Sequence, residues 1–413
     1  MFSIPNGIAA EKFTATTRYP RSFQVKFPHL MAATPKQKSV RSQLEALARA
    51  LGPGAQMPPI RQLGADLGVS LSTLNAALSE MEDRNMIRRR QGSGIFVAPT
   101  LDRCNLCLIC NPSSLLDFGE SPFWRLMIDA ARERAGTGGE DFSIHFAQLA
   151  NELSAETVLH ERLREDIARG TVHGVLSIGL PHSVTRWIEG CGVPVVSFAG
   201  ASNYIIRLQD SEVVTLGVAA LAGQGCRAIA LWAPHCAAPE AGHEAALLTV
   251  FRDALAAHGL PYLEKLADPL TGDTEAEMLW PHSFTGQGFA AMTRLAASGE
   301  PGPDGIVSMD DMLTQGLLMA RAAGGGAGDR PLRVATQANH GSPTLLGWQR
   351  TLTRIEFDPA EIIAAMFDVL ESLLRGEAPA RARSLPADPL LPGYHPPERE
   401  IPIHPRLVLP GAA

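Results

Sequence analysis

From residue 105 onward the chain alternates short apolar runs with amphipathic helical patterns, and this alternation limits the possible fold more than any other feature. The runs predict strands at Leu106–Cys110, Ser143–Phe146, Gly174–Ile178, Pro194–Ala199, Ala228–Ala233, Gly305–Asp310 and Leu332–Ala338, and a last strand in Ile401–Leu409. Helical patterns lie between them, near residues 122–135, 154–169, 182–190, 212–224, 242–258, 285–298, 312–322 and 359–375. Such alternation predicts an α/β fold with parallel sheets flanked by helices. We expect residues 101–413 to form two lobes, because about 300 residues exceed what one core usually holds.

The N-terminal part of the chain follows a different pattern. Residues 1–35 have no apolar period and predict a mobile tail, in which Met31 is an alternative start. Within residues 36–100, three helical patterns are separated by Gly52-Pro53-Gly54 and by Gly68-Val69-Ser70, and the third has its apolar side chains inward. Two helices joined by a short turn with Gly are typical of a helix-turn-helix. A hairpin follows, so we predict a winged helix-turn-helix.

Positive charge is concentrated at this end of the chain. Residues 1–99 carry 13 basic and 6 acidic side chains, whereas the other 314 residues carry 23 and 37. The hairpin MIRRRQGSGIFV alone holds three consecutive arginines. Taken alone, Arg88, Arg89 and Arg90 are equally consistent with a solvated edge. Together with the preceding helices, they indicate a partner rich in phosphate, namely double-stranded DNA.

The third helix of a helix-turn-helix enters the major groove with its N-terminal residues toward the bases. Its outward positions here are Ser70, Leu71, Ser72, Thr73 and Asn75. Asn75 is suited to bidentate pairing with adenine, whereas helix capping is an alternative or additional role for Ser72 and Thr73. We expect backbone contacts from Arg61, Arg88, Arg89 and Arg90, and a minor-groove approach by Gly92, Ser93 and Gly94.

The segment MPPIRQLGADLGVSLSTLNAALSEMEDRNMIRRRQGSGIFVA resembles the GntR-type winged helix almost position by position. The resemblance implies a DNA-binding transcriptional regulator. The family usually has Arg where this chain has Leu71 and Asn75, and a long basic or polar residue where it has Ser93. Those positions contact bases or backbone in the family, so the resemblance does not carry over the operator sequence.

The larger domain resembles, in several stretches, the sugar-binding domain of the lac and galactose repressor family, which is shaped like a two-lobed periplasmic binding protein. HGVLSIGLPHSVTRWIEGCGVPVVSF is similar to its third and fourth strands, and Gln209-Asp210 with the following helix is similar to the crossing between its lobes. PDGIVSMDDMLTQGLLMA is similar to the family's Asp-x-x-Ala-x-Gly element, with Asp311 and Gly316 at the Asp and Gly positions. EIPIHPRLVLP looks like the closing strand. Arabinose-type repressors combine the same two domains.

In a two-lobed fold, ligands bind in the crevice beyond the C-terminal ends of the strands. The side chains expected there are Asn111, Ser113, Phe123, Trp124, Gln148, Asp210, Asp310, Asp311 and Asn339. Carboxylates can accept two hydroxyl hydrogen bonds and aromatic faces can cover a sugar ring, so the set suits a polyol. The alternatives are a helix N-cap for Asp311 and core packing for Trp124. The family's ligand-contacting Arg would fall near Leu247, which leaves open an effector other than a usual sugar, or a degenerate pocket.

Two other functions are compatible with parts of the sequence. Cys104, Cys107 and Cys110 suggest an iron–sulfur site, but alternate side chains of a strand face opposite ways, which favours a buried strand. A fusion to an enzymatic or ligand-insensitive α/β domain is the alternative function, although no Walker loop, nucleophile elbow or cofactor-lysine motif is present. No apolar run of membrane-spanning length and no signal peptide is present, so we expect a cytoplasmic protein without membrane contact.

The sequence therefore predicts a transcriptional regulator, more specifically a repressor, that needs no cofactor, metal or catalytic residue. We expect two chains to associate through the effector domains and to place two recognition helices on the half-sites of an operator. A small-molecule effector, most simply a sugar or sugar derivative, would close the lobes and change the affinity for DNA.

Overall fold

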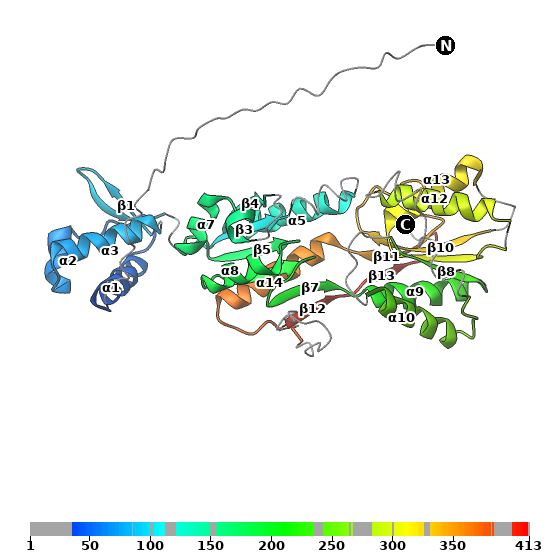
Figure 1. Ribbon diagram of the computed structural model, residues 1–413. Helices are drawn as coiled ribbons and strands as arrows, with labels where there is room; N and C mark the ends of the chain where they lie inside the picture. The colour runs from blue at the N-terminus through cyan, green and yellow to red at the C-terminus, as the bar shows by residue number, and fades with distance from the viewer. Residues whose placement is uncertain are drawn as a thin grey trace, which may run out of the picture.

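The computed structural model describes residues 35–84, 86–99, 101, 103–111, 121–148, 154–234, 243–263, 266, 283–299, 301–325, 331–380, 382–383 and 399–411. These residues form three bodies in a row, with a small helical body at one end followed by two α/β lobes (Figure 1). The expected N-terminal tail lies outside the described residues, apart from Pro35, which begins the first helix.

The small body is a winged helix. It consists of α1 (Pro35–Leu51), α2 (Ile60–Leu67), α3 (Leu71–Asp83) and an antiparallel hairpin of β1 (Ile87–Arg90) and β2 (Gly94–Val97). The expected inward residues of the third helix, Leu74, Leu78 and Met81, are fully buried, and they pack with residues of α1 and of both strands. The helical spacing of apolar residues in the sequence thus predicted the buried face of α3 correctly.

The first lobe contains a six-stranded parallel sheet with the order β12-β7-β6-β5-β3-β4. Its strands are β3 (Asn105–Cys110), β4 (Asp141–Phe146), β5 (Gly174–Ile178), β6 (Val195–Phe198), β7 (Tyr204–Leu208) and β12 (Arg399–Ile403). One face packs on α5 (Pro122–Gly138) and α14 (Pro359–Leu374). The other face packs on α6 (Ala155–Val158), α7 (Glu161–Ala168) and α8 (His182–Gly190).

The second lobe contains a five-stranded sheet with the order β13-β11-β10-β9-β8, parallel except for β13. Its strands are β8 (Ile229–Trp232), β9 (Gly305–Ser308), β10 (Arg333–Asn339), β11 (Thr353–Phe357) and β13 (Arg406–Val408). The helices α9 (Asp210–Gly223) and α10 (His243–Ala257) cover one face. The other face is covered by α12 (Phe284–Ala297) and α13 (Asp311–Ala320), which continues into the turn η2 (Arg321–Gly325).

The chain passes between the lobes three times. It leaves β7 through Gln209 into α9, returns from β11 through Asp358 into α14, and crosses again between β12 and β13. The expectation of one last strand in Ile401–Leu409 is therefore wrong, because His404 and Pro405 divide it into strands of two different sheets.

Three further expectations about elements need correction. The strands β7 and β11 were not predicted: β7 carries Arg207, and β11 alternates charged and apolar residues instead of forming an apolar run. The single helix expected over 154–169 is two helices, because Leu159 and His160 have extended backbone angles between them.

No helix in the part of the chain that the structure describes is long and apolar enough to cross a membrane.

Candidate nucleic-acid interface and effector cavity

Ser70 caps the N-terminus of α3. Its Oγ accepts a hydrogen bond from the backbone N–H of Thr73 at 3.2 Å and lies 2.9 Å from the hydroxyls of both Ser72 and Thr73. Ser70 therefore has the capping role that the sequence gave as an alternative for Ser72 and Thr73, whose side chains instead join the same hydroxyl cluster. This network fixes the first turn of the helix and engages all three hydroxyls with one another.

The outward face of α3 is uncharged in its first two turns. Leu71 is 52% exposed, Ser72 and Asn75 are also exposed, and no charged side chain occurs before Glu80. Arg61, in the first turn of α2, is exposed as well. The candidate base-contacting residues Leu71, Ser72 and Asn75 are thus accessible to a partner.

The three consecutive arginines of β1 lie in three different environments. Arg89 turns back to α3, where its Nη2 donates to the carbonyl oxygen of Asn75 and to the Ser79 hydroxyl at 3.2 Å each, and its Nε lies 3.4 Å from Glu82. Arg90 lies over the ring of Phe96, with Cζ 5.1 Å from the centroid. Arg88 is exposed. Strand alternation explains the division, because Arg89 points to the opposite face from its two neighbours.

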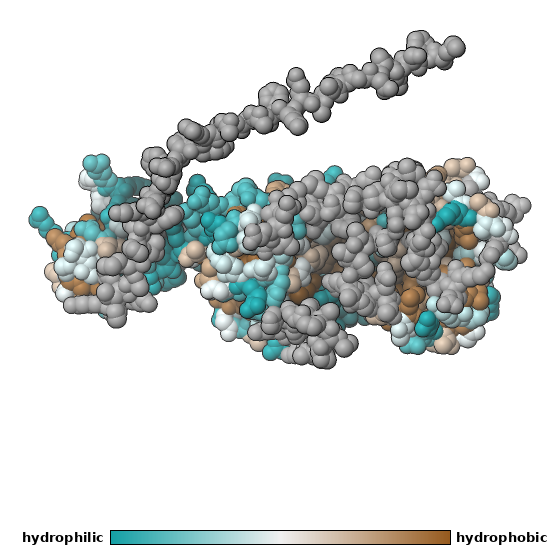
Figure 2. All heavy atoms as spheres, in the orientation of Figure 1, coloured by the Kyte–Doolittle hydropathy of each residue, from teal (hydrophilic) through white to brown (hydrophobic). Residues whose placement is uncertain are grey.

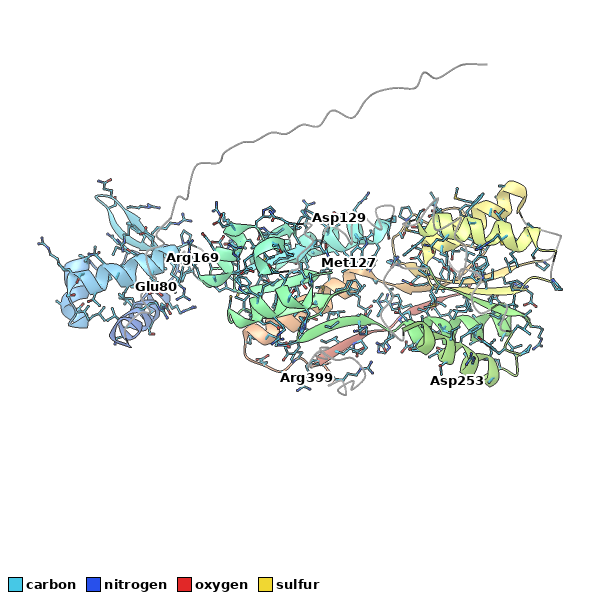
Figure 3. All side chains as sticks on the ribbon, viewed as in Figure 1. Glu80, Met127, Asp129, Arg169, Asp253 and Arg399 are labelled. Carbon is cyan, nitrogen blue, oxygen red and sulfur yellow. The ribbon has the colours of Figure 1, made fainter. Side chains whose placement is uncertain are left out.

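Arg88 also lines a polar pocket of about 320 Å³ between the winged helix and the first lobe, together with Arg49, Arg84 and Arg103. Hydrophilic residues gather where these two bodies meet (Figure 2), and Arg169 lies at the end of the first lobe nearest the winged helix (Figure 3). Arginines therefore line the junction between the winged helix and the first lobe, where Arg103 is paired with Asp141.

The tip of the wing depends on a residue that sequence reasoning did not single out. Gln56 donates from Nε2 to the carbonyl oxygen of Ser93 at 2.9 Å, and it forms an isolated bridge with Phe96. Gly92 and Gly94 have φ of 75° and 115°, which non-glycine residues rarely adopt. A Cβ on Gly94 would lie 2.9 Å from Gln56 Nε2. No pattern in the sequence pointed to Gln56, because its partner lies 37 residues away.

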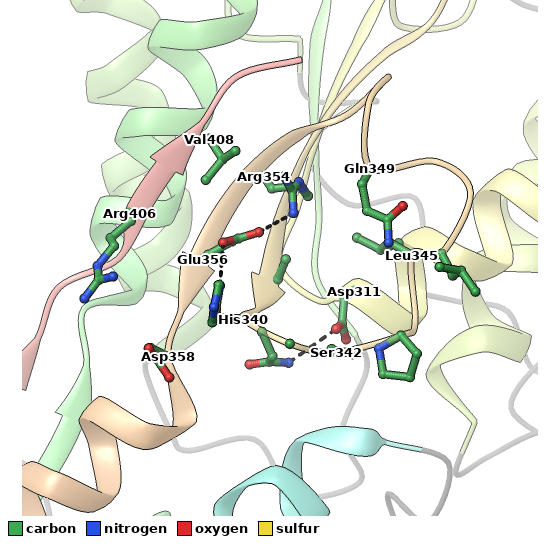
Figure 4. Close-up of a pocket in the computed structure, with 15 residues that line it drawn as sticks. Asp311, His340, Ser342, Leu345, Gln349, Arg354, Glu356, Asp358, Arg406 and Val408 are labelled. Atoms are coloured by element: carbon green, nitrogen blue, oxygen red, sulfur yellow. Dashed lines mark hydrogen bonds and ion pairs between the residues drawn. The ribbon is translucent and has the colours of Figure 1, made fainter. Parts of the chain in front are cut away.

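A cavity of about 660 Å³ lies in the second lobe, where β10, β11 and β13 meet the turn-rich segment 340–352 (Figure 4). Asp311 and Asn339, both predicted ligand contacts, line it, and Asn339 Nδ2 donates to Asp311 Oδ2 at 3.3 Å. Gly341, also in the lining, approaches Leu126 of α5 in the first lobe. The cavity is therefore close to the contact between the lobes.

The two adjacent carboxylates, both expected to contact the ligand, have different roles in the structure. Asp310, not Asp311, is the N-cap of α13, and its Oδ1 accepts from the backbone N–H groups of Met312 and Leu313 at 2.9 Å each. Burial and the neighbouring Asp311 raise the pKa of Asp310 to about 7, against the lowering effect of these two hydrogen bonds. Asp311 is 2% exposed, and burial raises its pKa although hydrogen bonds from Asn339, Ser342 and Thr344 oppose the shift. The pair therefore retains a proton more readily than isolated carboxyl groups.

Several polar residues of the cavity were missed in the sequence. Arg354 forms an ion pair with Glu356 at 2.5 Å, and His340 Nδ1 lies 3.3 Å from the other oxygen of Glu356. The Nε of Arg354 is buried and has no hydrogen-bond partner among the described residues. Gln349 and Arg406 also line the cavity. The alternation of charged and apolar residues in TRIEF was the available signal, since it places Arg354 and Glu356 on one face of β11.

The predicted ligand contacts of the first lobe do not line this cavity. Asn111 donates from Nδ2 to the carbonyl oxygen of Gly179, and Gln148 Nε2 lies 2.9 Å from His160 Nδ1. Phe123 is buried, and its ring packs edge-on against Trp124 at 5.0 Å and lies 5.8 Å from Phe198. Trp124 is partly buried against the core, as its alternative role proposed.

Two other predicted positions lie elsewhere. Asp210 begins α9 at the first crossing between the lobes, and Ser113 lies outside the described residues. Leu247, the position considered for a ligand-contacting arginine, is a core residue of the α10 face. The arginines that line the cavity come instead from β11 and β13, as Arg354 and Arg406.

The cysteines of β3 behave as expected for a strand. Cys104 and Cys110 contact the core on the α5 and α14 face, whereas Cys107 packs on the opposite face. Burial raises the pKa of Cys107 and Cys110 to about 12 each, which disfavours the thiolate that a metal requires. Among the described residues, no cluster of His, Cys, Asp and Glu is arranged to hold a metal ion.

Comparison with known families assigns both parts of the chain. Residues 37–97 match the bacterial regulatory proteins of the gntR family, and residues 218–393 match the periplasmic binding protein-like domain. The chain joins a gntR-type DNA-binding domain to a periplasmic-binding-protein-like domain. Both predicted resemblances and the predicted fold class are confirmed.

Individual relatives support the same division. The HTH-type transcriptional regulator SmoD of Agrobacterium fabrum is 36% identical over 58 residues, which are 14% of this chain and 25% of that protein. The match thus spans a quarter of this relative.

Solved structures resemble the larger domain. They include the regulator CcpA of Lactococcus lactis, with a TM-score of 0.50 and 15% identity over 75% of this chain and 99% of that one. The complex of CelR with cellobiose has a TM-score of 0.50 and 17% identity over 86% and 100%. A LacI-family regulator of Chloroflexus aggregans has a TM-score of 0.51 and 15% identity over 75% and 98%. At these identities the likeness shows the fold.

Proposed function

We propose that this protein is a sequence-specific transcriptional repressor whose DNA affinity is controlled by a small polyhydroxylated effector. The proposal divides the chain into a tail of residues 1–35, a DNA-binding domain of residues 36–100 and an effector domain of residues 101–413. The observation that carries it is the uncharged, exposed N-terminal face of α3 next to a hairpin with two outward arginines, Arg88 and Arg90. Such a surface combines base contacts with phosphate contacts.

The cavity of the second lobe is the proposed effector site. Its volume of about 660 Å³ lies within the range of small-molecule pockets. The acidic residues Asp311, Glu356 and Asp358 are offset by Arg354 and Arg406, so the lining favours a neutral ligand with many hydroxyl groups over a strongly charged one. Closure of the lobes on that ligand would alter the position of the winged helix, which requires only different affinities for the two lobe arrangements.

The proposal includes a homodimer, because an operator with two half-sites requires two recognition helices. Leu346, in the segment after β10, is 72% exposed, and Met319 on α13 is 46% exposed. Gln315 Nε2 donates to the carbonyl oxygen of Thr344, which holds that segment beside α13. Exposed apolar side chains of this size support association with a second copy.

The deciding experiment is selection of bound sequences from a random double-stranded DNA pool by the full-length protein. The selection is repeated with pools of neutral sugars, beginning with disaccharides because one structural neighbour was solved with cellobiose. We expect a palindrome with two matching half-sites, and enrichment that changes in one sugar pool. The variant Asn339→Ala serves as the matched control, since it should keep the palindrome and lose the sugar response. Binding without an enriched sequence, which only weakens with salt, would contradict the proposal.

A further inference from the structure

The first turn of α3 presents an unusual side chain for a surface that meets DNA. Leu71 is the first residue of the helix, and half of its side chain is exposed. The N-terminal residues of this helix are those that approach base edges in the major groove. A leucine here therefore either remains in water or contacts an apolar feature of a base.

The position of Leu71 is fixed by its neighbours. A Cβ built on Gly64 of α2 would lie 3.6 Å from Leu71 Cδ2, so one side of the leucine covers this glycine. The cap of Ser70 and the hydroxyls of Ser72 and Thr73 hold the backbone of the same turn. The exposed side of Leu71 is thus presented from an ordered turn and loses little side-chain entropy on contact with DNA.

The side chains around Leu71 are poorly suited to recognise guanine. Guanine presents two acceptors in the major groove, which Arg or Lys contacts best. The first two turns of α3 contain neither residue, and Arg89, the closest arginine of the wing, is held by Glu82, Ser79 and the carbonyl oxygen of Asn75. The Ser70 hydroxyl is hydrogen-bonded to the hydroxyls of Ser72 and Thr73.

The only large apolar group that base edges present in the major groove is the C5-methyl of thymine. We infer that Leu71 is a specificity-determining residue that contacts a thymine methyl group. Asn75 follows four positions later on the same side of the helix, with Cβ atoms about 6 Å apart. Base pairs stack about 3.4 Å apart, so Asn75 reaches an adenine one or two base pairs away. The two residues together select A·T pairs in each half-site.

This inference rests on the proposed function, and its test separates the two. The half-site is first selected with the full-length protein as described above. Each thymine of the selected duplex is then replaced singly by deoxyuridine, which removes only the methyl group. Burial of one methyl group predicts about a fourfold loss of affinity at one thymine position. Because this measurement uses the unchanged protein, it does not depend on the folding of any variant.

Variants then identify the residue responsible. Leu71→Ala should bind the thymine duplex more weakly and should bind the thymine and deoxyuridine duplexes equally. Asn75→Ala is the matched control, because it should lose the adenine preference and keep the discrimination against deoxyuridine. Leu71→Arg should change the preferred base at this position from thymine to guanine.

Two results would overturn the inference. The first is a wild-type affinity that changes less than twofold for every deoxyuridine substitution. The second is a Leu71→Ala variant that still binds the thymine duplex more tightly than the deoxyuridine duplex. Failure of the wild-type protein to enrich any sequence would instead overturn the regulator proposal itself.

Discussion

At the scale of single residues, Asp310 and Asp311 show what a sequence can and cannot reveal. Two carboxylates after a buried strand were correctly expected to lie at the C-terminal edge of the sheet. The N-cap, which the sequence offered as an alternative role for Asp311, belongs to Asp310, because a cap is decided by which residue has extended backbone angles. The contact between Asp311 and Asn339 was foreseen only as proximity, since it joins residues that are 28 positions apart.

The same pair predicts a dependence of stability on pH. The pKa of Asp310 is raised from 3.8 in the unfolded chain to about 7 in the folded one. A group with a raised folded-state pKa contributes stability below its unfolded pKa and loses it as the pH rises through the folded value. Asp311→Asn removes the neighbouring charge and keeps the cap, so this variant should gain stability over the wild type as the pH rises from about 4 to about 7.

Urea denaturation of both proteins at several pH values in that window measures the difference in the free energy of unfolding. A difference that stays constant across the window would show that the two carboxyl groups do not interact.

At the scale of elements, the packing of α12 against α13 depends on two glycines. A Cβ on Gly288 would lie 2.0 Å from the carbonyl oxygen of Leu313, and one on Gly316 would lie 1.9 Å from that of Thr285. The backbones of the two helices therefore approach more closely than any other residue would allow. The sequence resemblance had marked Gly316, but the need for Gly288 becomes visible only when both helices are placed.

Gly316→Ala should accordingly destabilise the second lobe by about 3 kcal/mol, because the backbones must separate to admit the methyl group. Gly136→Ala in α5 is the matched control, since nothing lies within 4 Å of its Cβ position and alanine favours a helix. The control should be neutral or more stable by about 0.5 kcal/mol. Urea denaturation of the full-length variants tests both values, and equal effects of the two substitutions would refute this account.

At the scale of the whole molecule, the order of strands and helices was largely predictable, whereas their assignment to sheets was not. Periodicity revealed the apolar runs of β3, β5 and β8, but the division of the last strand at His404 and Pro405 follows from pairing with β7 and β11. The cavity was likewise only half predicted, because Arg354 and Gln349 gain their role from elements distant in sequence. Local sequence patterns therefore reveal which face of a helix or strand is buried. Which strands are adjacent in a sheet depends on pairing between segments that are distant in the sequence.

The proposed dimer is tested at this scale. Met319→Glu places a charge on the exposed face of α13, outside the cavity lining, and should convert the dimer to a monomer at micromolar concentration. Leu263→Glu is the control, because Leu263 is also exposed but follows α10 on the other face of the sheet. Analytical ultracentrifugation distinguishes the two states. A wild-type protein that sediments as a monomer with and without DNA would rule out the dimer mechanism.

The third crossing of the chain has a consequence for protein synthesis. The winged helix is complete in sequence once residue 97 has been made, and it can fold while the ribosome is still translating. Neither lobe can be finished at that stage, because β12 and β13, which complete the two sheets, follow all the other strands of those sheets in the chain. A chain cut short by premature termination would therefore retain its DNA-binding domain and lack a strand from both lobes. The proposed function then predicts that nascent and truncated products bind DNA before they can respond to an effector.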